Sequence, residues 1–226
     1  HAFETMARIP TQAWQIPLEG EPETPAAPVF HGLKDGGPHQ GLPLGGIGAG
    51  GIGRDYRGAF RRWTLKTGAL KHFCDEANMF AVRVEREGGE ARAVALHPGH
   101  PAGPGSGGRR RRPLSAWDWD FEASEATYHA LFPKAWYRYP PTDQVPVDMV
   151  CEQFSPILPH NYRETSFPVG VFAWHLRNPG TEALTVSLLF SFTNMVGWFD
   201  EFGDRRPAEK NGGNINRPFA TDTEAG

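Results

Sequence analysis

The chain has 226 residues, of which 39% are hydrophobic and 22% are charged, and its formal net charge is −3. A chain of this length can bury the core of one large β domain or of two small ones. Because acids and bases are mixed, we expect no attraction to nucleic acid or to an anionic membrane. No apolar stretch approaches the ~20 residues needed to span a bilayer, so we also expect no transmembrane segment.

The first part of the chain, residues 1–40, is rich in proline and glycine and has no sustained hydrophobic period. We expect an extended lead-in there, with short edge strands at most. It contains no apolar region of a secretory signal. The chain has only two cysteines, Cys74 and Cys151, which imply no disulfide framework. We therefore predict a cytoplasmic protein.

A glycine run follows: the stretch "LGGIGAGGIG", residues 44–53, contains the dinucleotide-binding spacing G-x-G-x-x-G twice. That motif requires a buried strand before it and a helix after it, whose N-terminus meets the pyrophosphate. The flanking stretches "HQGLPL" and "RDYRGAFRRWTL" provide neither. We therefore predict no nucleotide cofactor. No other stretch of the sequence indicates a cofactor of a different kind. In a β protein, such glycines allow two backbones to approach closely or supply a positive φ, and we predict that role.

Apolar and polar residues alternate with period two from Asn78 onward, as is typical of strands. Residues 78–98 indicate a hairpin that turns at Gly88 and Gly89. Four further segments show strand character: an aromatic-rich one broken by Pro133 (128–139), an alternating one (145–154), one that is apolar on both faces and typical of the middle of a sandwich (167–176), and a second alternating one (183–194). No segment shows a helical period. The predicted fold is an antiparallel all-β sandwich over residues 41–200.

Three connecting regions complete the prediction. The turn "RNPGTE" places Pro179 and Gly180 where a preset φ and a positive φ are favoured. A Gly/Pro/Ser-rich stretch at 98–113 predicts a flexible loop, and its four arginines, Arg109–Arg112, indicate a solvated tip, with contact to a polyanion as the alternative. Residues 201–226 form a Gly/Asn-rich, truncated end.

Four stretches in chain order resemble the N-terminal domain of glycoside hydrolase family 116, of the bile-acid β-glucosidase or non-lysosomal glucosylceramidase type. They are "GLPLGGIGAGGIGRDYRGAFRRW" (41–63), "ALFPKAWYRY" (130–139), "FSPILPHNYRETSFPVGVFAWHLRNPG" (154–180) and "LLFSFTNMVGW" (188–198). Together they span most of the chain from Gly41 to Trp198.

The resemblance implies half of a retaining β-glycosidase: an N-terminal β-sandwich that packs on a C-terminal (α/α)6 catalytic domain. In that family the nucleophilic carboxylate and the acid/base carboxyl, about 5 Å apart in a retaining enzyme, both lie in the helical domain. We therefore expect no catalytic residue in this chain and no activity of the chain alone. The resemblance implies a β-glucoside or glucosylceramide as substrate of the full enzyme. A free-standing carbohydrate-binding sandwich that uses exposed tryptophans is the alternative.

Acids inside the chain offer a weaker catalytic pattern. Asp118 and Asp120 in "WDWDFE", and the acids Asp200, Glu201 and Asp204 in "WFDEFGD", stand beside aromatic residues. Carboxyl groups at i and i+2 share one side of a strand, whereas those of a glycosidase flank the bond from opposite sides. We expect these acids to be solvated loop residues.

Nor does the sequence predict a metal site. His97 and His100 lack further ligands, as do His72 and Cys74, and a structural zinc needs four.

Candidate contacts to the substrate cleft or to the second domain lie in two loops. One follows the glycine run and contains Arg61, Arg62 and Trp63; the other is the turn "HNYRE" with Asn161 and Tyr162. Trp and Tyr stack on sugar faces and Arg and Asn donate hydrogen bonds to hydroxyl groups, while pockets tend to form at domain interfaces. For Trp63 and Tyr162, packing in the core or between domains is the alternative.

Overall fold

The computed structural model describes residues 8–19, 29–30, 33–34, 41–66, 69–72, 74–99 and 117–193. The chain divides into two compact units, His1–Ser191 and Phe192–Gly226, and the fold described below is that of the first. Several predictions concern residues outside the described ones: the Arg109–Arg112 run, most of the loop 98–113, His100, the acids Asp200, Glu201 and Asp204, and the end at 201–226. The same holds for the side chain of His72.

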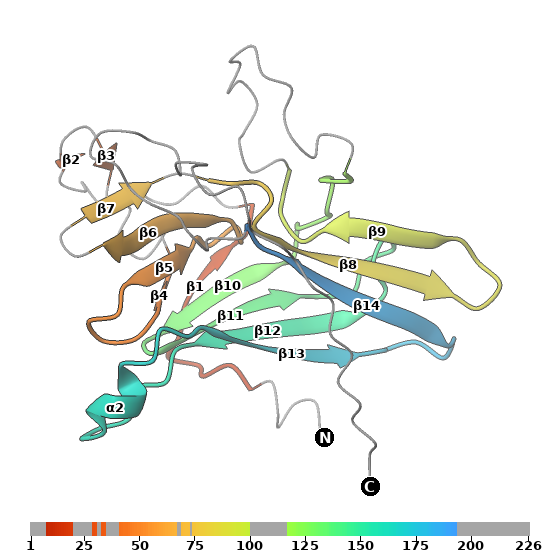
Figure 1. Cartoon of the computed structure of the whole chain (residues 1–226). Coiled ribbons are helices and arrows are strands. Elements are labelled where there is room, and N and C mark those ends of the chain that lie inside the picture. Colours follow the sequence, from red (N-terminus) through yellow and green to blue (C-terminus); the bar gives the residue numbers. More distant parts are fainter. Residues whose placement is uncertain are drawn as a thin grey trace, which may run out of the picture. The chain divides into compact units, whose positions relative to one another are not determined.

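One layer of the fold is a five-stranded antiparallel sheet in the order β1-β10-β11-β12-β13 (Figure 1). Its strands are β1 (Trp14–Pro17), β10 (Thr127–Leu131), β11 (Lys134–Tyr139), β12 (Asp148–Phe154) and β13 (Val171–Arg177). The lead-in therefore contributes a strand, and its residues Ile9 and Ala13 pack on the buried side chains Trp136 and Val150.

Two smaller antiparallel sheets lie against this layer. The four-stranded sheet contains β4 (Pro43–Leu44), β5 (Gly51–Arg54), β6 (Phe60–Lys66) and β7 (Ala69–His72). The three-stranded sheet has the order β14-β8-β9 and contains β14 (Leu184–Ser191), β8 (Met79–Arg86) and β9 (Ala91–Ala95). A separate short pair, β2 (Val29–Phe30) and β3 (Leu33–Lys34), lies in the lead-in. The described part contains one helix, α2 (Tyr162–Thr165), and no helix in that part is long and apolar enough to cross a membrane.

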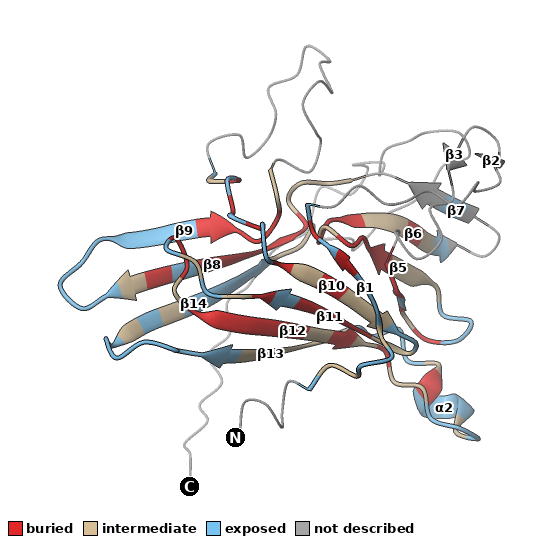
Figure 2. Ribbon diagram, turned by 180° about the vertical axis from the view of Figure 1, so that it is seen from behind, coloured by how far each residue is buried: buried red, intermediate tan, exposed pale blue. Residues whose placement is uncertain are grey.

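Aromatic side chains join the layers into a sandwich. The Phe80 ring of β8 lies 5.1 Å from Phe172 and 5.3 Å from Trp174 of β13, between ring centroids. Phe60 of β6 lies 6.1 Å from the Phe172 ring. Runs of buried residues lie along β8, β11 and β12 (Figure 2). These contacts confirm the predicted all-β sandwich.

An arginine lies at the centre of this aromatic core. Arg54 is fully buried, and its guanidinium carbon is 3.9 Å from the ring centroid of Tyr137 and 4.8 Å from that of Phe80. Its Nε donates a hydrogen bond of 2.9 Å to the Gly58 carbonyl, and Nη2 donates one of 3.3 Å to the Tyr139 hydroxyl. Arg54 thus connects β5, β8 and β11.

Three local predictions were wrong. The segment predicted as one strand over 128–139 is the hairpin β10–β11, because Phe132 and Pro133 form its turn. The segment that is apolar on both faces gives β13, which pairs only with β12 among the described strands and so lies at the edge of its sheet. Gly180 does not have a positive φ; instead, the Asn178 side chain shapes that turn by accepting from Gly180 N and donating to the Glu182 carbonyl.

Candidate functional site

The glycine run is packed tightly on both sides, as predicted. A Cβ atom on Gly46 would lie 2.4 Å from the carbonyl carbon and oxygen of Ser166, and one on Gly50 would lie 2.8 Å from the Thr64 carbonyl oxygen. With contacts this short to backbone atoms, a side chain at either position would force the backbone to shift. The prediction of close backbone approach is confirmed at Gly46 and Gly50, whereas Gly48 has open space around it and a positive φ of 76°. The described segment after the run forms strands β5 and β6, with no helix to bind a pyrophosphate.

Hydrogen bonds tie this loop to the segment that connects β12 with β13. Ile47 N donates to the Thr165 carbonyl at 2.9 Å, and Gly45 N donates to Ser155 Oγ at 2.7 Å. Ser155 Oγ donates in turn to the Val169 carbonyl at 2.8 Å. We call residues 45–50 together with residues 155–169 the loop junction. It joins the glycine run to the turn that contains Asn161 and Tyr162, whereas the other candidates, Arg61, Arg62 and Trp63, lie outside it on β6.

Within the loop junction, Asn161 shapes the helix that presents Tyr162. Asn161 is the N-cap of α2: its Oδ1 accepts from Glu164 N at 3.2 Å, and its Nδ2 donates to Glu164 Oε2 at 3.0 Å. A capping side chain satisfies backbone groups that a helix leaves free at its first turn. Tyr162 comes directly after the cap and is 78% exposed.

The loop junction and the neighbouring β10–β11 turn expose an unusual number of large apolar side chains. Ile47 and Phe167 are 59% and 45% exposed. The β10–β11 turn lies at the same end of the five-stranded sheet, because Lys134 pairs with Phe154 and Phe154 with Val171. The other exposed apolar residues at this end are Leu131, Phe132, Leu158 and Val169. An apolar surface of this kind is typical of a contact with another protein surface.

The other three predicted residues, Arg61, Arg62 and Trp63, lie on β6 and not in the loop junction. Trp63 is only 1% exposed, so its ring packs inside the sandwich. Arg61 Nε donates to Asp55 Oδ2 at 2.7 Å, while Asp55 Oδ1 accepts from Gly58 N and Ala59 N, both at 2.9 Å. Arg62 is half-buried and pairs in register with Gly53. The structure therefore brings Asn161 and Tyr162 to the loop junction, and leaves Arg61 at the turn that begins β6.

The acids beside tryptophan have structural partners. Asp118 Oδ2 accepts from Arg92 Nη2 at 3.1 Å, and Asp118 Oδ1 accepts from Asp120 N at 3.0 Å. The second bond closes a local turn, so the carboxylate holds its own loop. Asp120 is exposed and Trp119 is buried.

Among the described residues, no three metal-ligating side chains gather into a group. Burial raises the pKa of both thiols, Cys74 and Cys151, to about 11, so both are protonated at neutral pH.

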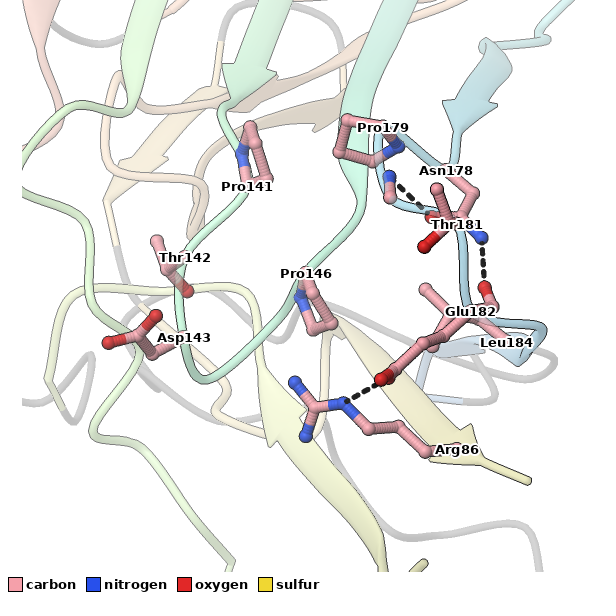
Figure 3. Close-up of a pocket in the computed structure, with 11 residues that line it drawn as sticks. Arg86, Pro141, Thr142, Asp143, Pro146, Asn178, Pro179, Thr181, Glu182 and Leu184 are labelled. Atoms are coloured by element: carbon pink, nitrogen blue, oxygen red, sulfur yellow. Dashed lines mark hydrogen bonds and ion pairs between the residues drawn. The ribbon is translucent and has the colours of Figure 1, made fainter. Parts of the chain in front are cut away.

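A polar pocket lies at the opposite end of the five-stranded sheet, between the β11–β12 loop and the β13–β14 turn (Figure 3). Its volume is about 440 Å³, and its lining includes Pro141, Pro146 and Pro179, but no aromatic residue. An ion pair of 3.9 Å joins Arg86 to Glu182 at its rim. Because sugars are usually held against aromatic rings, this pocket does not have the character of a carbohydrate site.

Comparison with known proteins agrees with this fold. Residues 41–225 match the family model described as "beta-glucosidase 2, glycosyl-hydrolase family 116 N-term". The matched range begins at Gly41, three residues before the glycine run, and includes β4 to β14 and the whole loop junction.

Proposed function

The chain belongs to glycosyl-hydrolase family 116, as its N-terminal domain, and we propose that it packs on the C-terminal catalytic domain of a retaining β-glucosidase and shapes the active-site cleft there. In this proposal the (α/α)6 domain supplies both catalytic carboxyl groups, and a β-glucoside or glucosylceramide is the substrate. Residues 41–200 form the main part of the sandwich, residues 1–40 are a lead-in that adds β1 to its five-stranded sheet, and residues 201–226 are a Gly/Asn-rich end. The enzyme is cytoplasmic, in keeping with two free cysteines in reduced form.

The observation that carries the proposal is the loop junction with its exposed apolar side chains. Two segments about a hundred residues apart are fixed to each other by hydrogen bonds, so their positions are defined without a partner. Yet Tyr162 and Ile47 project from this fixed base and are 78% and 59% exposed. A rigid base with large apolar projections is suited to a domain interface or to the mouth of a cleft.

The chemistry of Tyr162 is suited both to a domain interface and to the mouth of a substrate cleft. Its ring can stack on the face of a sugar or pack on apolar side chains, while the hydroxyl group remains available for a hydrogen bond. Asn161 acts on Tyr162 as a positioning residue through the helix cap. Trp63 supports β6 from inside the core, and Arg61 fixes the turn at Asp55.

The test is the substitution Tyr162→Ala in the full enzyme. We expect the KM for a β-glucoside to rise about fivefold, the loss of one aromatic contact. Tyr162→Phe keeps the ring and should retain most of the affinity. Trp117→Ala removes a partly exposed ring outside the loop junction and should leave the kinetics unchanged. If Tyr162→Ala alters neither the kinetics nor the thermal stability of the enzyme, the loop junction does not contact the cleft or the catalytic domain.

Two partly exposed tryptophans, Trp14 and Trp117, keep the alternative of a free-standing carbohydrate-binding sandwich open. Trp63, Trp119 and Trp136 are buried and cannot act as platforms. Retardation of the chain in a gel that contains a soluble β-glucan would support this alternative.

A further inference from the structure

The segment that carries Tyr162 is a long connection whose two ends are held together by one side chain. Residues 155–170 join β12 to β13, and α2 projects from the end of the sheet there (Figure 1). Ser155 Oγ donates to the Val169 carbonyl at 2.8 Å and so closes the connection at its base. Ser155 is only 4% exposed, and a hydrogen bond shielded from water is stronger than one at the surface.

A second hydroxyl group closes the connection halfway to its tip. Thr165 Oγ1 accepts from Leu158 N at 3.0 Å and donates to the Leu158 carbonyl at 3.2 Å. Thr165 is 3% exposed and is the buried residue of α2. A helix of four residues is not stable by itself in water, so α2 depends on bonds of this kind.

The glycine run is attached at the same two levels. Gly45 N donates to Ser155 Oγ at 2.7 Å, and Ile47 N donates to the Thr165 carbonyl at 2.9 Å. Ser155 Oγ therefore accepts from one loop and donates within the other, which uses both capacities of a hydroxyl group. Removal of this single oxygen would break the bonds to both Gly45 and Val169.

We propose that Ser155 is a positioning residue for substrate binding: its hydroxyl group fixes the base of the loop junction, and thereby the place of the Tyr162 ring in the cleft of the full enzyme. This inference rests on the function proposed above, in which Tyr162 contacts the cleft. Ser155 is buried, so it does not touch a substrate itself. It acts through the backbone, because Tyr162 lies between the two ends that its hydroxyl group holds together.

The exposure of Tyr162 explains why its position depends on the base. With 78% of its surface exposed, the side chain cannot be held by packing against the sandwich, so the backbone beneath must hold it. A binding group has to stay within about 0.5 Å of its working position, and a looser site loses affinity. The two loops are packed closely enough for this, since a Cβ on Gly46 would lie 2.4 Å from the Ser166 carbonyl.

The test is a double-mutant cycle in the full-length enzyme with Ser155→Ala and Tyr162→Ala. Ser155→Ala should raise the KM for a β-glucoside about threefold and change kcat by less than about twofold, because it weakens binding and not the chemical step. In the Tyr162→Ala background, the same substitution should change KM by less than about 1.5-fold, since the ring that Ser155 positions is absent. A hydroxyl group that only stabilises the fold would give the same ratio of KM values in both backgrounds.

The matched control is Thr142→Ala. Thr142 Oγ1 also accepts a backbone N–H within a loop, from Val145 at 3.0 Å, but it does so at the opposite end of the five-stranded sheet. Loss of this bond should leave KM unchanged, even where the enzyme unfolds at a lower temperature. A rise in KM equal to that of Ser155→Ala would overturn the proposal, because it would show that any lost loop bond has the same effect.

Hydrogen exchange measures the positioning itself. In Ser155→Ala, the amides of Gly45 and Ile47 should exchange with deuterium about tenfold faster than in the unmodified enzyme. Unchanged exchange at both amides would overturn the role of Ser155 whatever the kinetics show.

The outcomes also separate this proposal from the function on which it rests. If Tyr162→Ala leaves KM unchanged, the cleft contact proposed above is wrong, and the role of Ser155 in binding is wrong with it. If Tyr162→Ala raises KM but Ser155→Ala does not, or does so equally in both backgrounds, only the role of Ser155 is overturned.

Discussion

At the scale of single residues, Arg54 is the most unusual side chain of the core. In the part of the chain that the structure describes, its partners are a carbonyl, a phenol, a thiol and aromatic faces, with no carboxylate among them. Burial raises the pKa of Tyr139 and of Cys151, so neither carries a negative charge at neutral pH. The guanidinium remains charged in any such environment, and the ring faces and the Gly58 carbonyl must stabilise it. Nothing in its local sequence, "GIGRDY", indicates a buried position.

His97 makes stability depend on pH. Burial lowers its pKa to about 4, against an ordinary value of 6.5, with a smaller opposing effect from Asp55. Its Nδ1 lies 2.7 Å from the Gly99 carbonyl and must donate to it, and its buried Nε2 has no partner. The unfolded chain takes up a proton below pH 6.5 and the folded chain only below about pH 4. The free energy of unfolding should therefore fall by up to about 3 kcal/mol between these values as pH decreases.

The measurement is urea unfolding across this pH range for the chain and for His97→Asn. The asparagine amide can donate to Gly99 in place of Nδ1 but does not titrate. The difference in unfolding free energy between the two proteins should change with pH by up to about 3 kcal/mol, with the variant less sensitive to acid. Parallel curves would mean that His97 is not the group responsible.

At the scale of elements, the sequence predicted the hairpin β8–β9 well, because period-two alternation and the turn glycines are local signals. Gly88 does have a positive φ of 70°. The place of β13 in its sheet was not predictable, since an apolar pattern does not say which strands will be its neighbours. The same limit applies to the loop junction: the glycine run and the "HNYRE" turn each drew attention by their composition, but their contact joins Gly45 and Ser155, which are separated by 110 positions. Trp63 was a cleft candidate by residue type, and its burial follows from pairing that no local pattern reveals.

The loop junction should respond sharply to a single added methyl group. In Gly46→Ala the new Cβ would meet the Ser166 carbonyl at 2.4 Å, so the loop must move and the bond from Ile47 N to Thr165 would be strained or lost. We expect the free energy of unfolding to fall by about 1–3 kcal/mol. The control Gly180→Ala adds a methyl group 3.4 Å from its nearest neighbour, without a positive φ, and should have almost no effect. Equal stability of the two variants in urea unfolding would show that the contact at Gly46 can relax freely.

At the scale of the whole molecule, the fold class and the family could be predicted from the sequence. Which residues of the sandwich form its core and which form the exposed loop junction could not. The four motifs lie in the right order, and two of them, the glycine run and the "HNYRE" turn, meet at one end. Three of the described acids have structural partners: Asp118 and Asp55 each accept hydrogen bonds that hold their own turns, and Asp148 forms an ion pair with Arg177. Support of a separate catalytic domain is the function proposed above for this sandwich.

That role predicts where activity will be found. We expect the 226-residue chain not to hydrolyse an aryl β-glucoside, and a longer product of the same gene, extending past Gly226, to hydrolyse it with retention of the anomeric configuration. The reason is chemical: retention requires two carboxyl groups about 5 Å apart on opposite sides of the bond. Asp118, Asp55 and Asp148 are instead engaged in turns or ion pairs within the sandwich. The assay follows release of the aryl alcohol by both proteins at equal concentration. Activity of the short chain would indicate that Asp118 and Asp120 are catalytic candidates after all. An inactive longer product would count against β-glucosides as substrates.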